Sequence, residues 1–306
     1  MKKAVKIVSM ALAVIFVLFF IVRAIGKMYY GQTPQGGINE SMYVDINGTN
    51  QWISIYGENI DNPVLLYLHG GPGASTSSYD YAFTRKWADV FTVVTWDQRN
   101  CGKSYSPEQN DIELTYELLM SDGVEMTKFI LDYLGKDKIT VLGHSWGTFY
   151  GCNLVLEYPE YYEAYIGTGQ LVDFEKNEIA FKEAASEWAG DDEEGLALLN
   201  RLTIGDYTRD YYAARNEFMV KYGYDMFADG TDYSLGAAQY FNPYYSLADF
   251  INYINADGTV YEKFLSSEEF SKFTLTGRCE YQVPYFNING AKDYQTNYLI
   301  AQDYFD

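Results

Sequence analysis

The segment Gly-His-Ser-Trp-Gly at residues 143–147 constrains this chain most, because it follows directly on a short apolar run at residues 139–142. A serine with a glycine two residues away on each side is typical of a sharp turn that joins a strand to a helix and exposes the serine. The glycines are needed because the turn brings its backbone against neighbouring strands. The stretch from Phe149 to Tyr158, which Pro159 stops, is compatible with a helix. This context favours a strand–turn–helix unit over a chance pentapeptide.

Apolar runs and helical stretches alternate along the first half of the chain. A hairpin is expected at residues 42–56, around the tight-turn pair Asn47-Gly48. The other expected elements are buried strands at 63–68 and 91–96, a helix at 114–134, and strands at 139–142 and 165–168. Strands that alternate with helices predict an α/β fold, in which a mostly parallel sheet carries helices on both faces.

The chain changes character after about residue 170. Residues 171–276 are helical, acidic and rich in tyrosine, and a strand pattern returns only at residues 283–288. An insertion of this size between two strands predicts a helical cap over the carboxyl edge of the sheet, where ligands bind in such folds. We therefore expect a first part of the core at 40–170, a cap at 171–276, and a second, incomplete part of the core at 277–306.

Residues 1–27 form a separate segment. Lys2, Lys3 and Lys6 precede an apolar run at residues 7–22, and Arg23 and Lys27 follow it. The run reaches membrane-spanning length if Arg23 extends its charge toward the interface, so we expect an uncleaved signal-anchor helix rather than a cleaved signal peptide. The basic N-terminus predicts a single-pass protein of the cell membrane with its globular part outside. A secreted protein is the alternative, and membrane contact is expected through this helix only.

Charge and cysteine content exclude several partners. Of the 22 basic residues, five lie in residues 1–27, so the remainder sets 17 basic side chains against all 42 acidic ones. Such a surface repels phosphate backbones, and nucleic-acid binding is not expected. Cys101, Cys152 and Cys279 are scattered and show no metal-ligand spacing, so we expect no metal and no cofactor. Cys152 is expected to be a buried apolar residue after the turn.

Four motifs in order carry a family resemblance: His-Gly-Gly-Pro-Gly at 69–73, Asp-Gln-Arg-Asn-Cys-Gly-Lys-Ser at 97–104, the serine motif at 143–147, and Gly-Ala-Lys-Asp at 290–293. Together they resemble the α/β-hydrolase superfamily, and within it the proline iminopeptidase-like branch, over about residues 40–306. The resemblance implies a serine hydrolase of the α/β-hydrolase fold that releases N-terminal residues, proline among them, from short peptides through an acyl-enzyme. A carboxylesterase or lipase-like hydrolase and a non-catalytic binding protein remain alternatives.

The resemblance also assigns roles to single residues. Ser145 is the expected nucleophile, and the expected oxyanion hole combines the backbone N–H of Trp146 with that of Gly71 or Gly70. The expected triad acid is Asp293, for which a helix cap before Tyr294 is the alternative. In the resembling family the Asp97 motif is mainly structural, and this copy has Asn-Cys at 100–101 where a glycine is usual.

The base of the triad is missing. Triads of this fold run in the order Ser, Asp, His, whereas both histidines of the chain, His69 and His144, precede Ser145. The chain stops 13 residues after Asp293. We therefore expect a C-terminally truncated hydrolase rather than a complete inactive relative, and a catalytically crippled polypeptide.

The cap is expected to set specificity. Aminopeptidases of the resembling branch bind the free α-ammonium of a substrate with acidic cap residues, because a partly desolvated cation needs a paired carboxylate. Glu178 and Glu183 are the candidates, and a solvated acidic helix face is the alternative for each.

Overall fold

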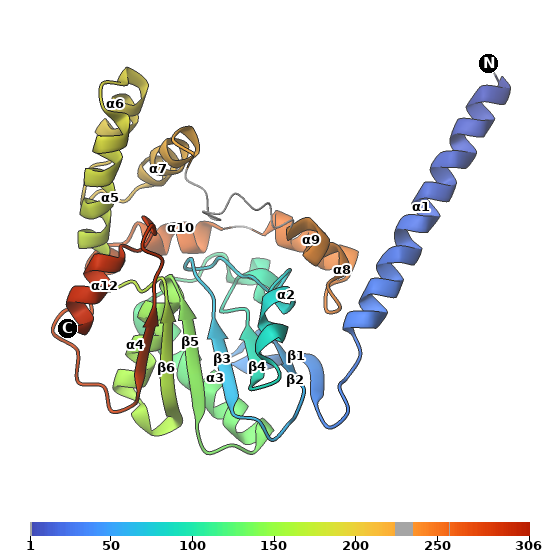
Figure 1. Cartoon of the computed structure of the whole chain (residues 1–306), viewed down its shortest axis with the longest axis horizontal. Helices are drawn as coiled ribbons and strands as arrows, with labels where there is room; N and C mark the ends of the chain where they lie inside the picture. The colour runs from blue at the N-terminus through green and yellow to red at the C-terminus, as the bar shows by residue number, and fades with distance from the viewer. Residues whose placement is uncertain (1, 224–234, 257) are drawn as a thin grey trace.

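The computed structural model describes residues 2–223, 235–256 and 258–306, and its core is a seven-stranded sheet (Figure 1). The spatial order is β1-β2-β4-β3-β5-β6-β7; β2 is antiparallel to β1 and β4, and the other neighbours are parallel. From β1 to β7 the strands span Ile38–Ile46, Thr49–Gly57, Val64–Leu68, Thr92–Trp96, Ile139–His144, Tyr162–Thr168 and Tyr285–Ile288. The predicted hairpin is β1–β2, and the mostly parallel sheet expected from the sequence is confirmed.

Helices α3 and α4 cover one face of this sheet. The first of them begins after Thr115, whose side chain accepts a hydrogen bond from the Leu118 backbone, and ends at Gly135 in a left-handed conformation with φ 61°. The second begins at Trp146, earlier than expected. The described helices from α1 to α12 span Lys2–Tyr30, Tyr81–Thr84, Tyr116–Leu134, Trp146–Glu157, Phe174–Ala189, Glu193–Asn200, Arg209–Lys221, Leu235–Phe241, Leu247–Asn255, Thr259–Leu265, Glu268–Ser271 and Tyr298–Phe305.

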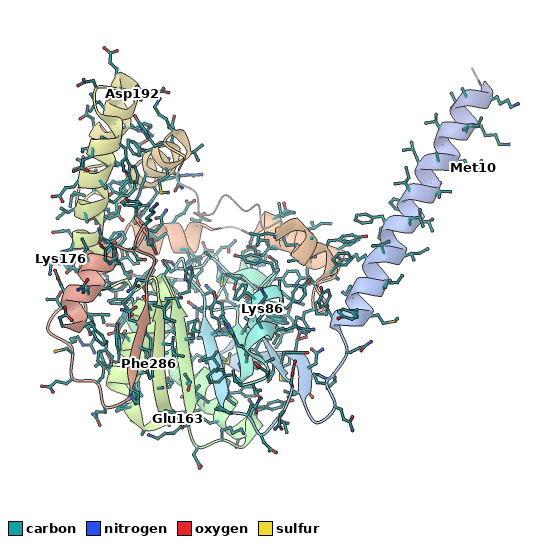
Figure 2. The ribbon with its side chains drawn as sticks, in the orientation of Figure 1. Met10, Lys86, Glu163, Lys176, Asp192 and Phe286 are labelled. Carbon is teal, nitrogen blue, oxygen red and sulfur yellow. The ribbon has the colours of Figure 1, made fainter. Side chains whose placement is uncertain are left out.

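The opposite face of the sheet has a thinner cover. A small cluster of Leu65, Tyr67, Val93 and Leu142 lies there under Phe83 and Trp87, which belong to α2 and the short turn after it. Toward β7 this face is open, and Phe286 is 55% exposed (Figure 2). Helices therefore lie on both faces, as predicted, but the second layer covers only part of the sheet.

The order of the strands fixes the position of the site. After β3 the chain crosses to β4 on one side, and it then returns to place β5 on the other side of β3. In such sheets the loops that leave two strands in opposite directions open a crevice at their carboxyl ends. The loop after Leu68 and the turn after His144 both begin at this crevice.

The segment predicted to be the cap, residues 171–276, is mainly helical in its described parts, and we call it the cap below. Its described helices run from α5 to α11, and Figure 1 shows α5, α7, α9 and α10 along one edge of the sheet. Its α10–α11 part packs on the core through an aromatic cluster centred on Trp146, whose ring lies 5.8 Å from those of Phe264 and Phe270 and 5.7 Å from that of Phe273, between centroids. This cluster fixes the C-terminal part of the cap against the start of α4.

Helix α1 extends beyond the predicted segment of residues 1–27 to Tyr30, and it projects away from the sheet (Figure 1). Among the described helices, only its Lys3–Tyr30 stretch has the length and apolarity needed to cross a bilayer, with a mean hydropathy of 2.8. Both a membrane anchor and a signal sequence have these properties.

Candidate active site

Ser145 occupies the tip of a strained turn between β5 and α4. Its φ of 53° and ψ of −120° are unusual for a residue with a side chain, and its backbone N–H donates to the Thr168 carbonyl at 3.0 Å. A Cβ on Gly147 would lie 2.2 Å from the Leu68 carbonyl oxygen, and one on Gly143 would lie 2.3 Å from the Gly147 oxygen. The motif needs glycine at both positions because the turn presses against β3 and against itself.

The glycine loop after β3 lies directly beside this serine. A Cβ on Gly70 would be 3.2 Å from the Ser145 Cβ, a tight contact that glycine avoids. Gly71 has a φ of 124° and lines the same cavity as Ser145 and Trp146. As the first residue of α4, Trp146 has a backbone N–H for which the helix provides no acceptor. The three residues expected to form the oxyanion hole are therefore brought together around Ser145.

His69 holds the glycine loop in place through its imidazole ring. The imidazole is buried, and its Nε2 accepts the Gln98 backbone N–H at 3.4 Å. The ring proton therefore lies on Nδ1, which donates to the Gly70 carbonyl at 2.8 Å. Burial lowers the pKa of His69 to about 4, so the ring stays neutral at physiological pH. Both ring nitrogens are occupied, which removes His69 as a base for Ser145.

We predict that this buried imidazole makes folding sensitive to acid. The pKa of His69 falls from 6.5 to about 4 on folding, so the unfolded chain binds more protons between these pH values. The free energy of unfolding should therefore decrease as the pH is lowered through this window, by up to about 3 kcal/mol from His69. Chemical denaturation at several pH values, on the wild type and on His69→Asn, isolates the contribution. A difference between the two proteins that does not change with pH would contradict it.

His144 lies on the exposed side of the turn. Its Nδ1 is 3.2 Å from the Thr168 Oγ1. Desolvation by neighbouring atoms lowers the pKa of His144, while hydrogen bonding to Thr168 and the charge of Asp293 act in the opposite direction. The chain contains two histidines, so no other imidazole is present to connect Ser145 with Asp293.

Asp293 follows β7 at the same edge of the sheet. Its Oδ1 accepts the backbone N–H groups of Gln295 at 2.8 Å and Thr296 at 3.1 Å, and its Oδ2 accepts the Thr296 hydroxyl at 2.9 Å. The carboxylate therefore caps the turn before α12, whereas the cap of α12 itself is Asn297. A Cβ on Gly169 would lie 3.2 Å from Oδ2, so this glycine lets the carboxylate approach the end of β6.

Asp97 supports the loops rather than the cavity. Its buried carboxylate accepts hydrogen bonds from the hydroxyls of Ser75 and Ser77 and from the Lys103 backbone N–H, the last two at 2.7 Å. Burial raises the pKa of Asp97 to about 6. It joins the segment after the glycine loop to the segment after β4, in agreement with the structural role expected for this motif.

A cavity of about 220 Å³ opens beside Ser145 and reaches into the cap. Its lining combines apolar side chains with polar ones, which we call the polar wall, so the cavity can hold a substrate that has both kinds of surface. Its lining comprises Gly71, Ser145, Trp146, Leu171, Phe174, Asn177, Glu178, Tyr212, Arg215, Asn216, Leu265, Phe270, Gln295 and Thr296.

The polar wall is built around a buried ion pair. Glu178 and Arg215 are only 3% and 6% exposed, and the Arg215 Nε lies 2.9 Å from the Glu178 Oε2. The Tyr211 hydroxyl donates to the same oxygen at 2.7 Å, which leaves the Asn177 amide, at 3.3 Å, as the partner of Oε1 among the described residues. The arginine also donates to the Gln295 side chain at 2.5 Å, so the pair connects the cap to the turn held by Asp293.

The two acidic candidates of the cap differ in position. Glu178 lines the cavity, whereas Glu183 is exposed on the same helix and is not among the lining residues. Sequence reasoning missed Arg215, the basic partner in this wall. The only available signal was the four-residue spacing between Tyr211 and Arg215, which places both on one face of α7.

Comparison with known proteins agrees with this architecture. A family model described as the alpha/beta hydrolase fold matches residues 63–294. A "Probable aminopeptidase YbaC" of Bacillus subtilis is 34% identical over 130 residues, 42% of this chain and 41% of that protein. A "Proline iminopeptidase" of Clostridioides difficile is 31% identical over 186 residues, 59% of this chain and 60% of that protein. The chain thus matches about half the length of these relatives.

Solved structures show the same fold. The crystal structure of a proline iminopeptidase from Mycobacterium smegmatis superimposes with a TM-score of 0.59 at 22% identity, and covers 87% of this chain and 86% of that one. The family match extends over more than half of the chain and includes the strands and turns that surround Ser145. The relatives confirm the resemblance to the proline iminopeptidase-like branch, and the chain belongs to the α/β-hydrolase family.

Proposed function

We propose that this protein is a serine hydrolase of the aminopeptidase type, which releases N-terminal residues, proline among them, from short peptides. The observation that carries the proposal is the cavity itself, because Ser145, Gly71 and the buried Glu178 line one space. The relatives named as an aminopeptidase and as proline iminopeptidases support the same substrate class. Arg215 and Tyr211 occupy Oε2 of Glu178, so the proposed partner of the α-ammonium group, when this group leaves water, is Oε1, which Asn177 approaches at 3.3 Å.

In the proposed reaction the Ser145 hydroxyl attacks the carbonyl carbon of the first peptide bond. The developing oxyanion lies against the backbone N–H groups of Trp146 and Gly71, the positions at which fixed donors stabilise the transition state. Collapse of this intermediate breaks the C–N bond, the amine leaves with a proton, and the acyl group remains on Ser145. Water then attacks the ester, and the free residue leaves with regeneration of the hydroxyl.

The proton of Ser145 needs an acceptor. In the proposed triad Asp293 orients an imidazole, but His69 has both nitrogens occupied and His144 belongs to the turn itself. This chain therefore supplies a nucleophile, oxyanion donors and an acid without a positioned base. We expect slow turnover by this polypeptide alone.

Paired assays on the full chain test the substrate class. We expect release of the arylamine from a prolyl-arylamide and loss of that release when the proline nitrogen is acetylated, because Glu178 needs the cation. A short-chain acyl ester is the comparison substrate. Ester turnover without amine-dependent arylamide cleavage would favour a carboxylesterase instead. Absence of both reactions, together with no labelling of Ser145 by a fluorophosphonate, would favour a binding protein.

Two glutamates on one helix provide a matched pair for this test. Glu178→Gln removes the charge that faces the cavity, and we expect KM for the arylamide to rise roughly 10- to 100-fold, as for loss of a charged hydrogen bond. Glu183→Gln removes an exposed charge of the same helix and should leave KM unchanged. An equal effect of the two substitutions would exclude a specific role for Glu178.

We also propose that α1 remains attached as a membrane anchor, with the hydrolase outside the cell. The last turns of α1 support this proposal because they are packed into the globular part: Arg23 is buried, and the Tyr30 ring lies 5.0 Å from that of Tyr81, between centroids. A cleaved signal peptide is expected to lack such fixed contacts with the mature protein.

A further inference from the structure

The C-terminal half of α1 is joined to one particular part of the cap. The Arg23 guanidinium donates to the Tyr245 carbonyl at 2.9 Å and also to the Tyr240 carbonyl, and the Lys27 ammonium donates to the Tyr245 carbonyl at 2.6 Å. Gly26 faces the Phe241 ring so closely that a Cβ would overlap it. These contacts fix α8 and the segment before α9 against α1. Figure 1 shows α8 beside the C-terminal end of α1, with α9 next to α8.

Phe19 shows how far this contact extends along α1 toward the apolar run. Its ring lies 4.6 Å from that of Tyr240, between centroids, and its carbonyl accepts the Tyr240 hydroxyl. Phe19 belongs to the apolar run of residues 7–22, and at 1.5 Å per residue it lies about 6 Å further along α1 than Arg23. If the apolar run is in the bilayer, the Tyr240 side chain is at the level of its outer boundary.

The adjacent helix α9 presents an apolar face without a partner among the described residues. Leu247, Ile251 and Ile254 are 42%, 59% and 78% exposed, and their spacing of four and three residues places them on one side of the helix. The charged residue of α9, Asp249, points the other way and lies 3.5 Å from the Lys103 ammonium. The inner side is also packed through Phe250, whose ring lies 4.9 Å from that of Tyr245.

We infer that α8 and α9 lie in the headgroup region of the outer leaflet, with the apolar face of α9 against lipid. The inference rests on the proposed anchoring by α1, and it extends the membrane contact beyond that helix. An uncharged apolar face beside the end of a spanning helix fits the boundary between headgroups and acyl chains. Neutral phospholipid is the expected partner, because the strongly acidic chain repels anionic lipid.

This contact places the bilayer close to the glycine loop. The Asn242 amide, between α8 and α9, donates to the carbonyls of Ser77 and Ser78 at 2.8 Å each, and the Tyr253 hydroxyl donates to the Ser75 carbonyl at 3.1 Å. These serines follow the glycine loop that lines the cavity. The proposed lipid-facing helices therefore hold the segment that directly follows the glycine loop.

The test uses the full chain in nanodiscs of phosphatidylcholine. In a Cys279→Ser background, in which Cys101 and Cys152 are buried, Ile254→Cys accepts an environment-sensitive fluorophore. Glu163→Cys is the control at the end of the sheet away from the cap (Figure 2), and Val14→Cys reports the middle of α1. Lipids that carry a nitroxide either at the headgroup or deep in the acyl chain serve as quenchers.

We expect blue-shifted emission and quenching by the headgroup nitroxide at position 254, quenching by the deep nitroxide at position 14, and neither effect at position 163. Water-like emission at position 254 would overturn the inference. A blue shift at position 254 without quenching by lipid would also overturn it, because protein rather than lipid would cover the helix. Absence of quenching at position 14 would remove the anchor on which it rests, while the assays of the proposed hydrolase would be unaffected.

Discussion

Added imidazole will accelerate arylamide cleavage by the wild-type chain and will have no such effect on Ser145→Ala. In the proposed mechanism Ser145, the oxyanion donors and Asp293 lack only a positioned base, and a free imidazole is small enough to take that role. Without a base, the remaining groups of a triad enzyme still give about 10³- to 10⁴-fold acceleration over water. We expect a residual rate of this order in both wild type and Ser145→Ala, because binding and the oxyanion donors remain, and a saturable increase with imidazole in wild type only.

The control for this prediction is Asp293→Asn. The amide keeps the shape of the carboxylate but cannot stabilise an imidazolium, so the imidazole-dependent increase should fall in this variant. The measurement is the rate of arylamine release against imidazole concentration, corrected for the reaction in buffer. Equal rates for wild type and Ser145→Ala at every concentration would show that Ser145 is not the nucleophile.

Removal of one partner of the buried Glu178–Arg215 ion pair will strongly destabilise the fold. Glu178→Ala leaves the Arg215 guanidinium charged and nearly inaccessible to water, and an uncompensated buried charge of this kind costs about 3–5 kcal/mol. The double variant Glu178→Ala/Arg215→Met removes both charges and should recover much of the loss, when compared with Glu178→Ala and Arg215→Met alone. Denaturant unfolding of the full chain in detergent gives the free energies for this double-mutant cycle.

The exposed pair of Glu125 and Lys128 provides the comparison. Its side chains are 45% and 47% exposed, so water already solvates both charges when either partner is removed. Glu125→Ala should therefore cost far less than Glu178→Ala. Similar losses in the two variants would mean that the buried pair is solvated in solution and that our account of the cavity wall is wrong.

The fold could be predicted from the sequence because the local patterns of apolar residues coincide with the strands and helices of the sheet. The apolar runs at 63–68 and 91–96 correspond to β3 and β4, because a strand that is buried on both faces needs a continuous run of apolar residues. The stretch with helical periodicity at 114–134 corresponds to α3. The turn at Ser145 could also be predicted, because two glycines are required by contacts of the turn with β3 and with itself.

The polar wall of the cavity could not be predicted in the same way. Arg215 and Glu178 lie on different helices, and their contact depends on how α5 and α7 pack, which no local pattern encodes. The packing of α1 on Tyr240 and Phe241 was missed for the same reason. Asp293 was placed by resemblance, but its capping of the turn before α12 follows from geometry that the sequence does not specify.

The aromatic cluster around Trp146 has a consequence for how the cavity admits a substrate. The residue that contributes the proposed oxyanion N–H carries a ring clamped between the core and α10–α11, so this donor is preorganised by the cap as well as by α4. A lid movement that lifted α10–α11 would expose Trp146, Phe270 and Phe273 to water together. Exposing these buried aromatic rings has a high free-energy cost. We therefore expect substrate to enter and product to leave by a path that keeps α10 and α11 packed on the core.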